Sequence, residues 1–269
     1  YNADYVVSGC TDELACNFNQ NATMDDGSCI YPDTTSTEII SCESYDWNGQ
    51  TYTESGTYEH LIQESDNNYS MSFDGVDDYI KIGDGSQYSE SSFSFFTWIN
   101  PIDDGDFQTI AGKRGNYNES FNGDAGWEFT ITPNAELRFT LPDYAEYISP
   151  LNSIQYNQYQ FVGFTIDSTN LKIYCNGINI YSAYMANTIT SNTVPLGIGD
   201  DNGLDFFDDM FSGKIDEIQF WNIILSESQI QSYFSCPPSG NEQGLVGYWN
   251  FEEGQGNIVN DLSGNGNDG

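Results

Sequence analysis

Carboxylates are crowded into one short stretch of the sequence, between Gly199 and Gly213. The stretch reads GDDNGLDFFDDMFSG and carries five aspartates between two expected strands: Asp200, Asp201, Asp205, Asp208 and Asp209. Carboxylates this close repel one another unless a cation lies between them. Calcium takes about six to eight oxygen ligands, and loops between strands supply them without a fixed spacing. The stretch is therefore a candidate calcium site, with a solvated acidic rim as the alternative interpretation.

A second candidate cation site is the stretch DLSGNGNDG, from Asp261 to Gly269. Asp261, Asn267 and the residues between them could surround a cation with oxygen ligands. Asp77 or Asp78, from the first strand of the main segment, could add a carboxylate. The competing interpretation is a solvated turn, because Asp, Asn and Gly are also the common turn residues.

Residues for the common catalytic and zinc chemistries are scarce. His60 is the single histidine, so a Ser-His-Asp arrangement has no evident partners. No cysteine pair has the CxxC spacing of zinc sites. The Gly-rich segments do not open a helix after a strand, which a phosphate-binding loop requires. We therefore expect a protein that is not an enzyme.

The charge balance narrows the class of partner. The 269 residues include 6 Lys and Arg against 41 Asp and Glu, for a formal net charge of -35. Such a chain repels phosphate backbones and anionic lipids, so we expect no nucleic-acid partner, and no apolar run is long enough for membrane insertion. Aromatic residues make up 15% and hydrophobic residues 38%, too many for a disordered chain. The partners expected for this acidic surface are cations, glycans or other proteins.

The elements expected to position these residues are strands, which makes the fold class all-β. From residue 68 onward, short segments with alternating apolar residues predict strands. Asn176-Gly177 lies between two such segments and predicts a type I′ hairpin. One helix is expected, over SESQIQSYF, with Ser226 as its N-cap and Ile230 and Phe234 on one face.

Three segments are predicted along the chain. Residues 1–32 are rich in Cys, Asp, Asn and Gly and too poor in large apolar side chains to fold without disulfides or a metal. Residues 33–67 are predicted as a linker and β-ribbon, and residues 68–269 as the main domain. Three of the six cysteines lie between residues 10 and 29, which favours an oxidising compartment and hence secretion. The residues alone leave every cysteine pairing open.

Four phrases in the main segment resemble, in order, a bacterial laminin-G-like domain of the concanavalin A-like superfamily, to which pentraxins also belong. The phrases are FDGVDDYIKIG, FTWINP, SGKIDEIQFWNIILSESQI and GLVGYWNFEEGQGNIVNDLSGNGNDG. The resemblance implies two antiparallel sheets packed as a jelly-roll sandwich, with the first and last strands side by side. It also implies one more strand after Gly269, so that the sequence would stop inside a longer protein.

The resemblance to pentraxins implies a set of calcium ligands. The equivalent stretch in pentraxins provides ligands, together with the loop after a Lys-Arg-like pair, which points to Asp201 and Asp209, with Asn116 or Asn118 opposite. This chain differs in having Gly199 where pentraxins have a Glu. Its loop 115–124 is also longer.

Related glucanases of the superfamily suggest a test for catalysis. They carry Glu, Asp and Glu at alternate positions of one strand, so that nucleophile and acid face one cleft. Here the corresponding run contains Asp216 and Glu217, and the other acids are missing. The resemblance therefore implies a structural strand instead of a glycosidase site.

The first 32 residues resemble a short repeat of large cell-surface proteins from Bacteroidetes-type marine bacteria, with the pattern GCTD, AC, DDGSC. In such repeats the first and last cysteines are the constant pair, which implies a disulfide between Cys10 and Cys29. The phrase CESYDWNGQTY resembles another repeat of the same proteins.

The leading hypothesis is a non-catalytic, calcium-stabilised binding or adhesion module of a large secreted or cell-surface protein. Its ligand would be a glycan or a protein on a surface, and Tyr144, Tyr147, Tyr156 and Tyr159 could stack on sugar rings. One alternative is a structural subunit of an extracellular fibre or surface layer, which binds copies of itself. Another is an accessory domain of a secreted polysaccharide-degrading enzyme.

Overall fold

The chain divides into two compact units in the computed structural model. The smaller unit comprises Tyr1–Asp66 with Ser235–Pro237, and the larger comprises Asn67–Phe234 with Pro238–Gly269. The predicted division into three segments stays a prediction. The structure describes residues 6–12, 15, 21–25, 27, 29, 45–47, 50–52, 69–83, 86–88, 91–114, 126–141, 145–186, 189, 192–200 and 209–269.

The smaller unit contains a disulfide and a two-stranded ribbon. Cys10 is bonded to Cys29 with an S–S distance of 2.09 Å, so this predicted pairing is confirmed. The ribbon pairs its two strands antiparallel, with Tyr45 opposite Tyr52, where a β-ribbon was expected. Its strands are β1 (Tyr45–Trp47) and β2 (Gln50–Tyr52).

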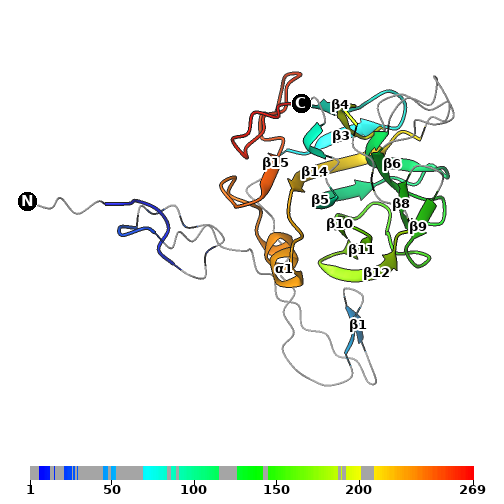
Figure 1. The fold of residues 1–269 in the computed structure, drawn as a ribbon, viewed down its shortest axis with the longest axis horizontal. Coiled ribbons are helices and arrows are strands. Elements are labelled where there is room, and N and C mark those ends of the chain that lie inside the picture. Colours follow the sequence, from blue (N-terminus) through cyan, green and yellow to red (C-terminus); the bar gives the residue numbers. More distant parts are fainter. Residues whose placement is uncertain are drawn as a thin grey trace, which may run out of the picture. The chain divides into compact units, whose positions relative to one another are not determined.

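The larger unit is a sandwich of two antiparallel sheets, which confirms the predicted jelly-roll architecture (Figure 1). The seven-stranded sheet contains β3 (Met71–Asp74), β5 (Ser92–Pro101), β10 (Gln160–Asp167), β11 (Asn170–Cys175), β12 (Ile178–Tyr184), β14 (Ser212–Trp221) and β15 (Leu245–Trp249). The six-stranded sheet contains β4 (Ile80–Ile82), β6 (Gln108–Arg114), β7 (Gly126–Ile131), β8 (Leu137–Leu141), β9 (Ala145–Ile148) and β13 (Leu196–Ile198). A 3-10 turn, η1 (Ser86–Tyr88), and one helix, α1 (Glu227–Ser235), complete the described elements.

The first and last strands do not pair with each other as expected. Instead both pair with β14, β3 along Ser212–Ile215 and β15 along Ile218–Trp221. The ten residues of β14 are long enough to carry two short strands end to end along one edge. A bulge separates the two pairings, because the register of β14 against β5 shifts between Asp216 and Gln219.

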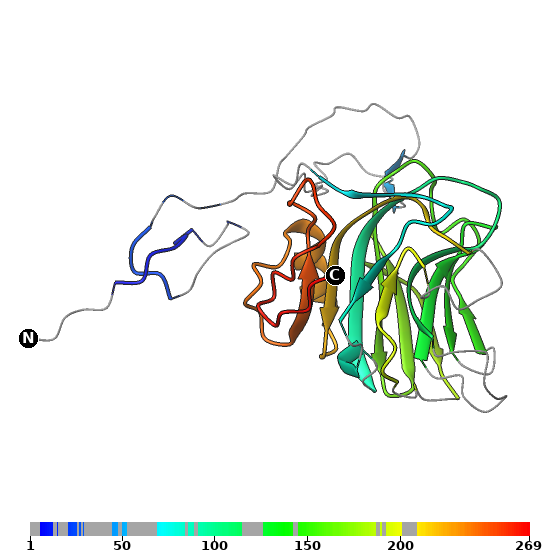
Figure 2. The same cartoon turned by 90° about the horizontal axis from the view of Figure 1, so that it is seen from above.

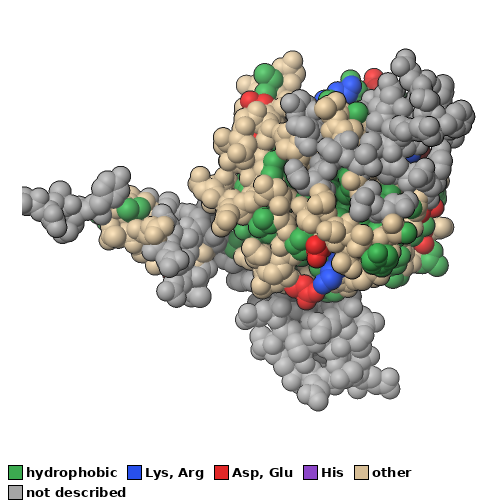
Figure 3. Space-filling model, viewed as in Figure 1, with side chains coloured by type: hydrophobic (Ala, Val, Ile, Leu, Met, Phe, Trp, Pro, Cys, Tyr) green, Lys and Arg blue, Asp and Glu red, His purple; other side chains and the backbone are tan. Residues whose placement is uncertain are grey.

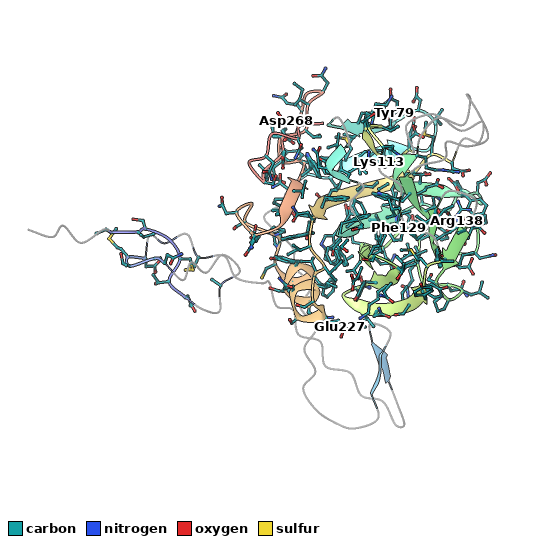
Figure 4. The ribbon with its side chains drawn as sticks, viewed as in Figure 1. Tyr79, Lys113, Phe129, Arg138, Glu227 and Asp268 are labelled. Atoms are coloured by element: carbon teal, nitrogen blue, oxygen red, sulfur yellow. A yellow bond between two sulfur atoms is a disulfide. The ribbon has the colours of Figure 1, made fainter. Side chains whose placement is uncertain are left out.

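Aromatic side chains fill the space between the two sheets. Phe164 on β10 contacts five other rings at centroid distances of 4.8 to 5.8 Å: Phe93, Phe95, Trp127, Phe129 and Phe139. Rings at such distances add to the stability that comes from burial alone. Figure 4 shows Phe129 in the middle of this core, between the two sheets.

The outer face of the seven-stranded sheet carries α1, beside β14 and β15 (Figure 2). The helix begins as predicted, since the Ser226 hydroxyl accepts the Gln229 N–H at 3.3 Å and the Gln229 side chain accepts the Ser226 N–H at 3.0 Å. This reciprocal pair satisfies backbone donors that a helix start leaves free. Ile230 and Phe234 are buried against the sheet, as their spacing indicated.

The predicted hairpin at Asn176-Gly177 is also present. It joins β11 to β12, and its two residues have φ angles of 49° and 73°, the positive values that a type I′ turn requires.

Within the described part of the chain, no helix has the length and apolar character needed to cross a membrane.

Candidate functional site

Several acidic loops meet at one end of the sandwich. Ser212, the first residue of β14, pairs with Asp74 at the end of β3, and Gly213 pairs with Pro101 at the end of β5. The β3–β4 turn, the β5–β6 loop and the termini of the β13–β14 connection therefore share this end. We call it the acidic end, and its described carboxylates are Asp74, Asp77, Asp78, Asp103, Asp104, Asp106, Asp200 and Asp209.

The β3–β4 turn draws three of these carboxylates together. The Asp74 carboxylate accepts the N–H groups of Val76 at 2.8 Å and Asp77 at 3.4 Å, while the Asp78 carboxylate accepts the Asp74 N–H at 3.0 Å. Aspartate folds turns in this way because its short side chain reaches backbone donors two or three residues along the chain. Carboxylate oxygens of Asp74, Asp77 and Asp78 consequently lie within 4.8 Å of one another, and all three residues are exposed.

Such a group has the chemistry of a calcium site. Three carboxylate oxygens on one side leave the remaining ligand positions to backbone carbonyls and water, a combination that calcium accepts. Asp77 and Asp78 were expected to contribute to a different loop, and Asp74 was not among the predicted ligands. In the sequence, the spacing of the three aspartates around Gly75 could have indicated this group. Gly75 has a φ of 78° and closes the turn.

The first residues of the stretch from residue 199 to 213 lie near this turn, directly after β13. A Cβ added to Gly199 would lie 3.3 Å from the Asp78 carbonyl oxygen, so Asp200 follows directly beside the turn. The Thr109 N–H donates to the Asp209 carbonyl oxygen at 2.7 Å, which ties the far end of the stretch to β6. Asp200 is buried and Asp209 partly exposed. The other predicted ligands of this site, Asp201, Asn116 and Asn118, lie outside the described residues, so the ligand set stays a prediction.

The second predicted cation site has a different arrangement. The buried Asp261 carboxylate accepts three backbone N–H groups, from Tyr248 at 3.1 Å, Ser263 at 2.9 Å and Asn267 at 3.0 Å. The Asn267 side chain accepts from Gln87 at 2.5 Å and donates to the Val246 carbonyl at 2.8 Å. Both side chains thus attach the loop to its neighbours.

No hydrogen bond among the described residues joins this loop to Asp77 or Asp78. Asn267 instead lies near Gly83, at the other end of β4 from the β3–β4 turn. Metal binding by Asp261 and Asn267 remains a prediction, and a cation there would have to share oxygens that already accept hydrogen bonds.

The strand that resembles the glucanase motif holds a buried carboxylate in a protein hydrogen bond. Glu217 lies in the β14 bulge with a φ of 52°, and its carboxylate accepts a short hydrogen bond from the Tyr248 hydroxyl. Burial raises the pKa of Tyr248 above its ordinary value, and the neighbouring Glu217 charge raises it further. The next alternate positions of β14 are Gln219 and Trp221, so the alternating Glu, Asp and Glu of the glucanase motif are not present on this strand.

The described tyrosines among the four considered for sugar stacking differ in their exposure. Tyr147 and Tyr156 are partly buried and pack against the core. Tyr159 is 46% exposed, and its hydroxyl donates to Ser70 at 3.2 Å. Tyr144 lies outside the described residues. Stacking of Tyr147, Tyr156 and Tyr159 on sugar rings stays a prediction, and the core covers part of the first two.

One solved structure shares this fold, and two others are similar to part of the chain. A protein from Bacteroides ovatus, to which carbohydrate binding is provisionally assigned, superposes with a TM-score of 0.60 at 21% identity, over 74% of this chain and 56% of its own. A carbohydrate-binding module of a Ruminococcus gnavus sialidase, solved with α2,3-sialyllactose, gives a TM-score of 0.46 at 14% identity, over 54% of this chain and 84% of its own. Domain 4 of an extracellular arabinanase from Geobacillus stearothermophilus, solved with arabinotriose, gives 0.46 at 18% identity, over 66% and 82%.

Sequence comparison identifies the family. No protein with a curated function matches the chain. Residues 74–231, more than half of the chain, match the sequence model of a family described as the concanavalin A-like lectin/glucanases superfamily. The match includes most of the strands of both sheets and runs into α1. The chain therefore belongs to the concanavalin A-like lectin/glucanase superfamily.

Proposed function

We propose that the larger unit is a non-catalytic carbohydrate-binding module that is stabilised by calcium and works outside the cell. The observation that carries the calcium part is the group formed by Asp74, Asp77 and Asp78, whose carboxylate oxygens converge within 4.8 Å. In a chain with a formal net charge of -35, these carboxylates have few cationic side chains to neutralise them. A divalent cation would relieve their repulsion and hold the β3–β4 turn.

Carbohydrate binding is supported by the family and by one structural neighbour. The superfamily description includes lectins, and the Bacteroides ovatus protein that shares the fold has carbohydrate binding assigned to it. The absence of catalysis is supported by Glu217, which is buried and bonded to Tyr248. A retaining glycosidase needs two carboxyl groups about 5 to 5.5 Å apart at an accessible cleft.

Export is supported by the oxidised cysteines. Both Cys10 and Cys29 form a disulfide, and Cys236 is disulfide-bonded as well. Such bonds persist mainly in extracellular or otherwise oxidising compartments. Adhesion, a fibre or surface-layer role, membership of a larger repeat protein and an accessory role in a polysaccharide-degrading enzyme stay predictions, because they depend on what surrounds this chain.

The calcium part is tested by thermal unfolding in EDTA and in millimolar CaCl2. Calcium at about 100 times its dissociation constant stabilises the folded state by about 2.7 kcal/mol, which for a domain near 200 residues raises the Tm by roughly 5 to 10 °C. Asp77→Asn should remove most of this rise while leaving the Tm in EDTA unchanged. The charge-matched control is Asp167→Asn at the end of β10, since β10 pairs Asp167 with Ser92, at the opposite end of β5 from the acidic end.

Two results would contradict the calcium part. One is a Tm that is the same in EDTA and in calcium. The other is an equal response from Asp77→Asn and Asp167→Asn, which would show a general charge effect.

The carbohydrate part is tested by screening the chain on an array of neutral and acidic glycans in calcium. The absence of any reproducible glycan signal would overturn it.

A further inference from the structure

A groove lies on the outer face of the seven-stranded sheet, between its β10–β12 side and the segment that leads into α1. It has a volume of about 900 Å³ and is lined entirely by described residues of the larger unit. Sites for small ligands typically have volumes of about 300 to 1,000 Å³, so the groove can accept more than one sugar unit. Glu227 is one of its lining residues, and Figure 4 shows it at α1, near β12.

The floor of the groove is a regular array of polar side chains. Strand pairing aligns Asp167, Asn170 and Tyr184 in one row across β10, β11 and β12. The next outward row consists of Thr165, Lys172 and Ser182. Neighbouring strands are about 4.8 Å apart and successive outward residues about 6.6 Å apart, so the floor presents donors and acceptors at regular intervals.

The opposite wall is held in place by two contacts. The Ser94 hydroxyl donates to the Ile223 carbonyl at 2.8 Å and accepts the Leu225 N–H at 3.0 Å, which fixes the segment before α1 on β5. Across the groove, the Lys172 ammonium group forms an ion pair with Glu227 at 3.3 Å. Figure 3 shows a basic side chain beside acidic ones on this face, next to hydrophobic side chains. The two walls are therefore positioned before any ligand binds.

The chemistry of the lining favours a neutral polyhydroxylated ligand. Tyr184 is 73% exposed, which leaves the face of its ring free to stack on the C–H face of a sugar. The opposite charges of Lys172 and Glu227 neutralise each other. The remaining carboxylate of the lining, Asp167, can accept hydrogen bonds from sugar hydroxyls but repels acidic sugars. The net charge of -35 adds to that repulsion.

We propose that this groove binds a neutral oligosaccharide, with Tyr184 as the stacking platform and with Asn170 and Asp167 as its hydrogen-bonding partners. The proposal rests on the carbohydrate binding proposed above and assigns it to a place in the fold. The groove lies far from the acidic end, as Figure 4 shows by the separation of Glu227 from Tyr79, which follows the β3–β4 turn. Calcium therefore has no direct contact with the ligand.

The test is isothermal titration of the full chain with cellohexaose, maltohexaose and mannohexaose as neutral probes and hexagalacturonate as an acidic probe. At least one neutral probe should bind, and hexagalacturonate should bind more weakly. Tyr184→Ala should weaken the binding of that neutral probe by about tenfold or more, the scale of one lost aromatic contact. Tyr184→Phe keeps the ring and should bind within about twofold of the wild type.

The matched control is Tyr159→Ala, which removes another exposed tyrosine and should leave binding unchanged. Unchanged thermal unfolding of each variant shows that the fold is intact. If Tyr184→Ala and Asn170→Ala both bind the neutral probe as tightly as the wild type, the groove is not the binding site, although the chain still binds carbohydrate. If no probe and no array glycan binds the wild type, the proposed function itself is wrong.

Discussion

Replacing Asp261 with Asn separates a structural role from metal binding at this residue. The Asp261 carboxylate is buried and accepts the N–H groups of Tyr248, Ser263 and Asn267, at 2.9 to 3.1 Å. These bonds attach the 261–269 loop to β15. Asn has the same shape but a single acceptor oxygen, so its NH2 group must face one of the three donors.

The expected loss of stability follows from these contacts. A hydrogen bond to a charged group contributes about 1.5 to 3 kcal/mol, and a buried donor without a partner costs about 1 to 3 kcal/mol. Asp261→Asn loses one such bond outright and weakens two, so we expect a loss of about 2 to 3 kcal/mol. For a domain near 200 residues this lowers the Tm by roughly 4 to 12 °C.

The assay is urea unfolding of the wild type and the variant, in EDTA and in CaCl2. A structural role predicts the same loss in both buffers. Asp104→Asn is the control, because Asp104 lies in the exposed β5–β6 loop, where its carboxylate accepts only the Asp106 N–H, and it should cost less than about 0.5 kcal/mol. A structural role for Asp261 is refuted if Asp261→Asn matches the wild type in EDTA and differs only in calcium, since Asp261 would then act as a metal ligand.

Two further predictions concern the core and the free thiol. Phe164→Ala should lower the free energy of unfolding by about 3 to 5 kcal/mol, because it removes the ring that contacts five others. Tyr79→Ala is the control at an exposed site and should change the free energy of unfolding little. Similar urea midpoints for the two variants would contradict this prediction. Burial raises the pKa of the Cys175 thiol from 9.0 to about 12, so a native chain should not react with a disulfide reagent at pH 8 until it unfolds. Because the folded pKa lies above the unfolded one, the contribution of this thiol to stability is complete below pH 9 and is lost as the pH rises toward 12. Cys175→Ala should therefore lose less stability than the wild type across that interval. An equal loss of stability in both proteins would count against the raised pKa of Cys175.

Local sequence patterns predicted much of the architecture. The Asn176-Gly177 turn, the Ser226 cap and the two buried positions of α1 involve residues within a few positions of one another, and the structure contains all of them. The Cys10–Cys29 bond followed from resemblance to a repeat and not from the residues alone. In each case the interaction joins residues that are close together in the sequence, or it belongs to a recognisable sequence pattern.

Other features depend on contacts between segments far apart in the chain. Asp261 was considered as a metal ligand because Asp and Asn suit both turns and cations, and only its three backbone donors show that it anchors a loop. The pairing of β3 and β15 along one edge of β14 depends on strand lengths and on a bulge that periodicity does not reveal. The groove combines β10, β11 and β12 with the segment before α1, which begins 40 residues after the end of β12.

The residues by themselves therefore determined that this is an acidic, aromatic-rich all-β chain with one capped helix, because alternation, turn residues and caps act over a few residues. The sandwich arrangement was implied by the resemblance to a family. Tertiary structure alone decided which carboxylates converge, which are used by the backbone, and where a ligand-sized groove opens. The physical reason is that a site depends on distances of a few ångströms between side chains, and these distances are set by sheet register and loop packing.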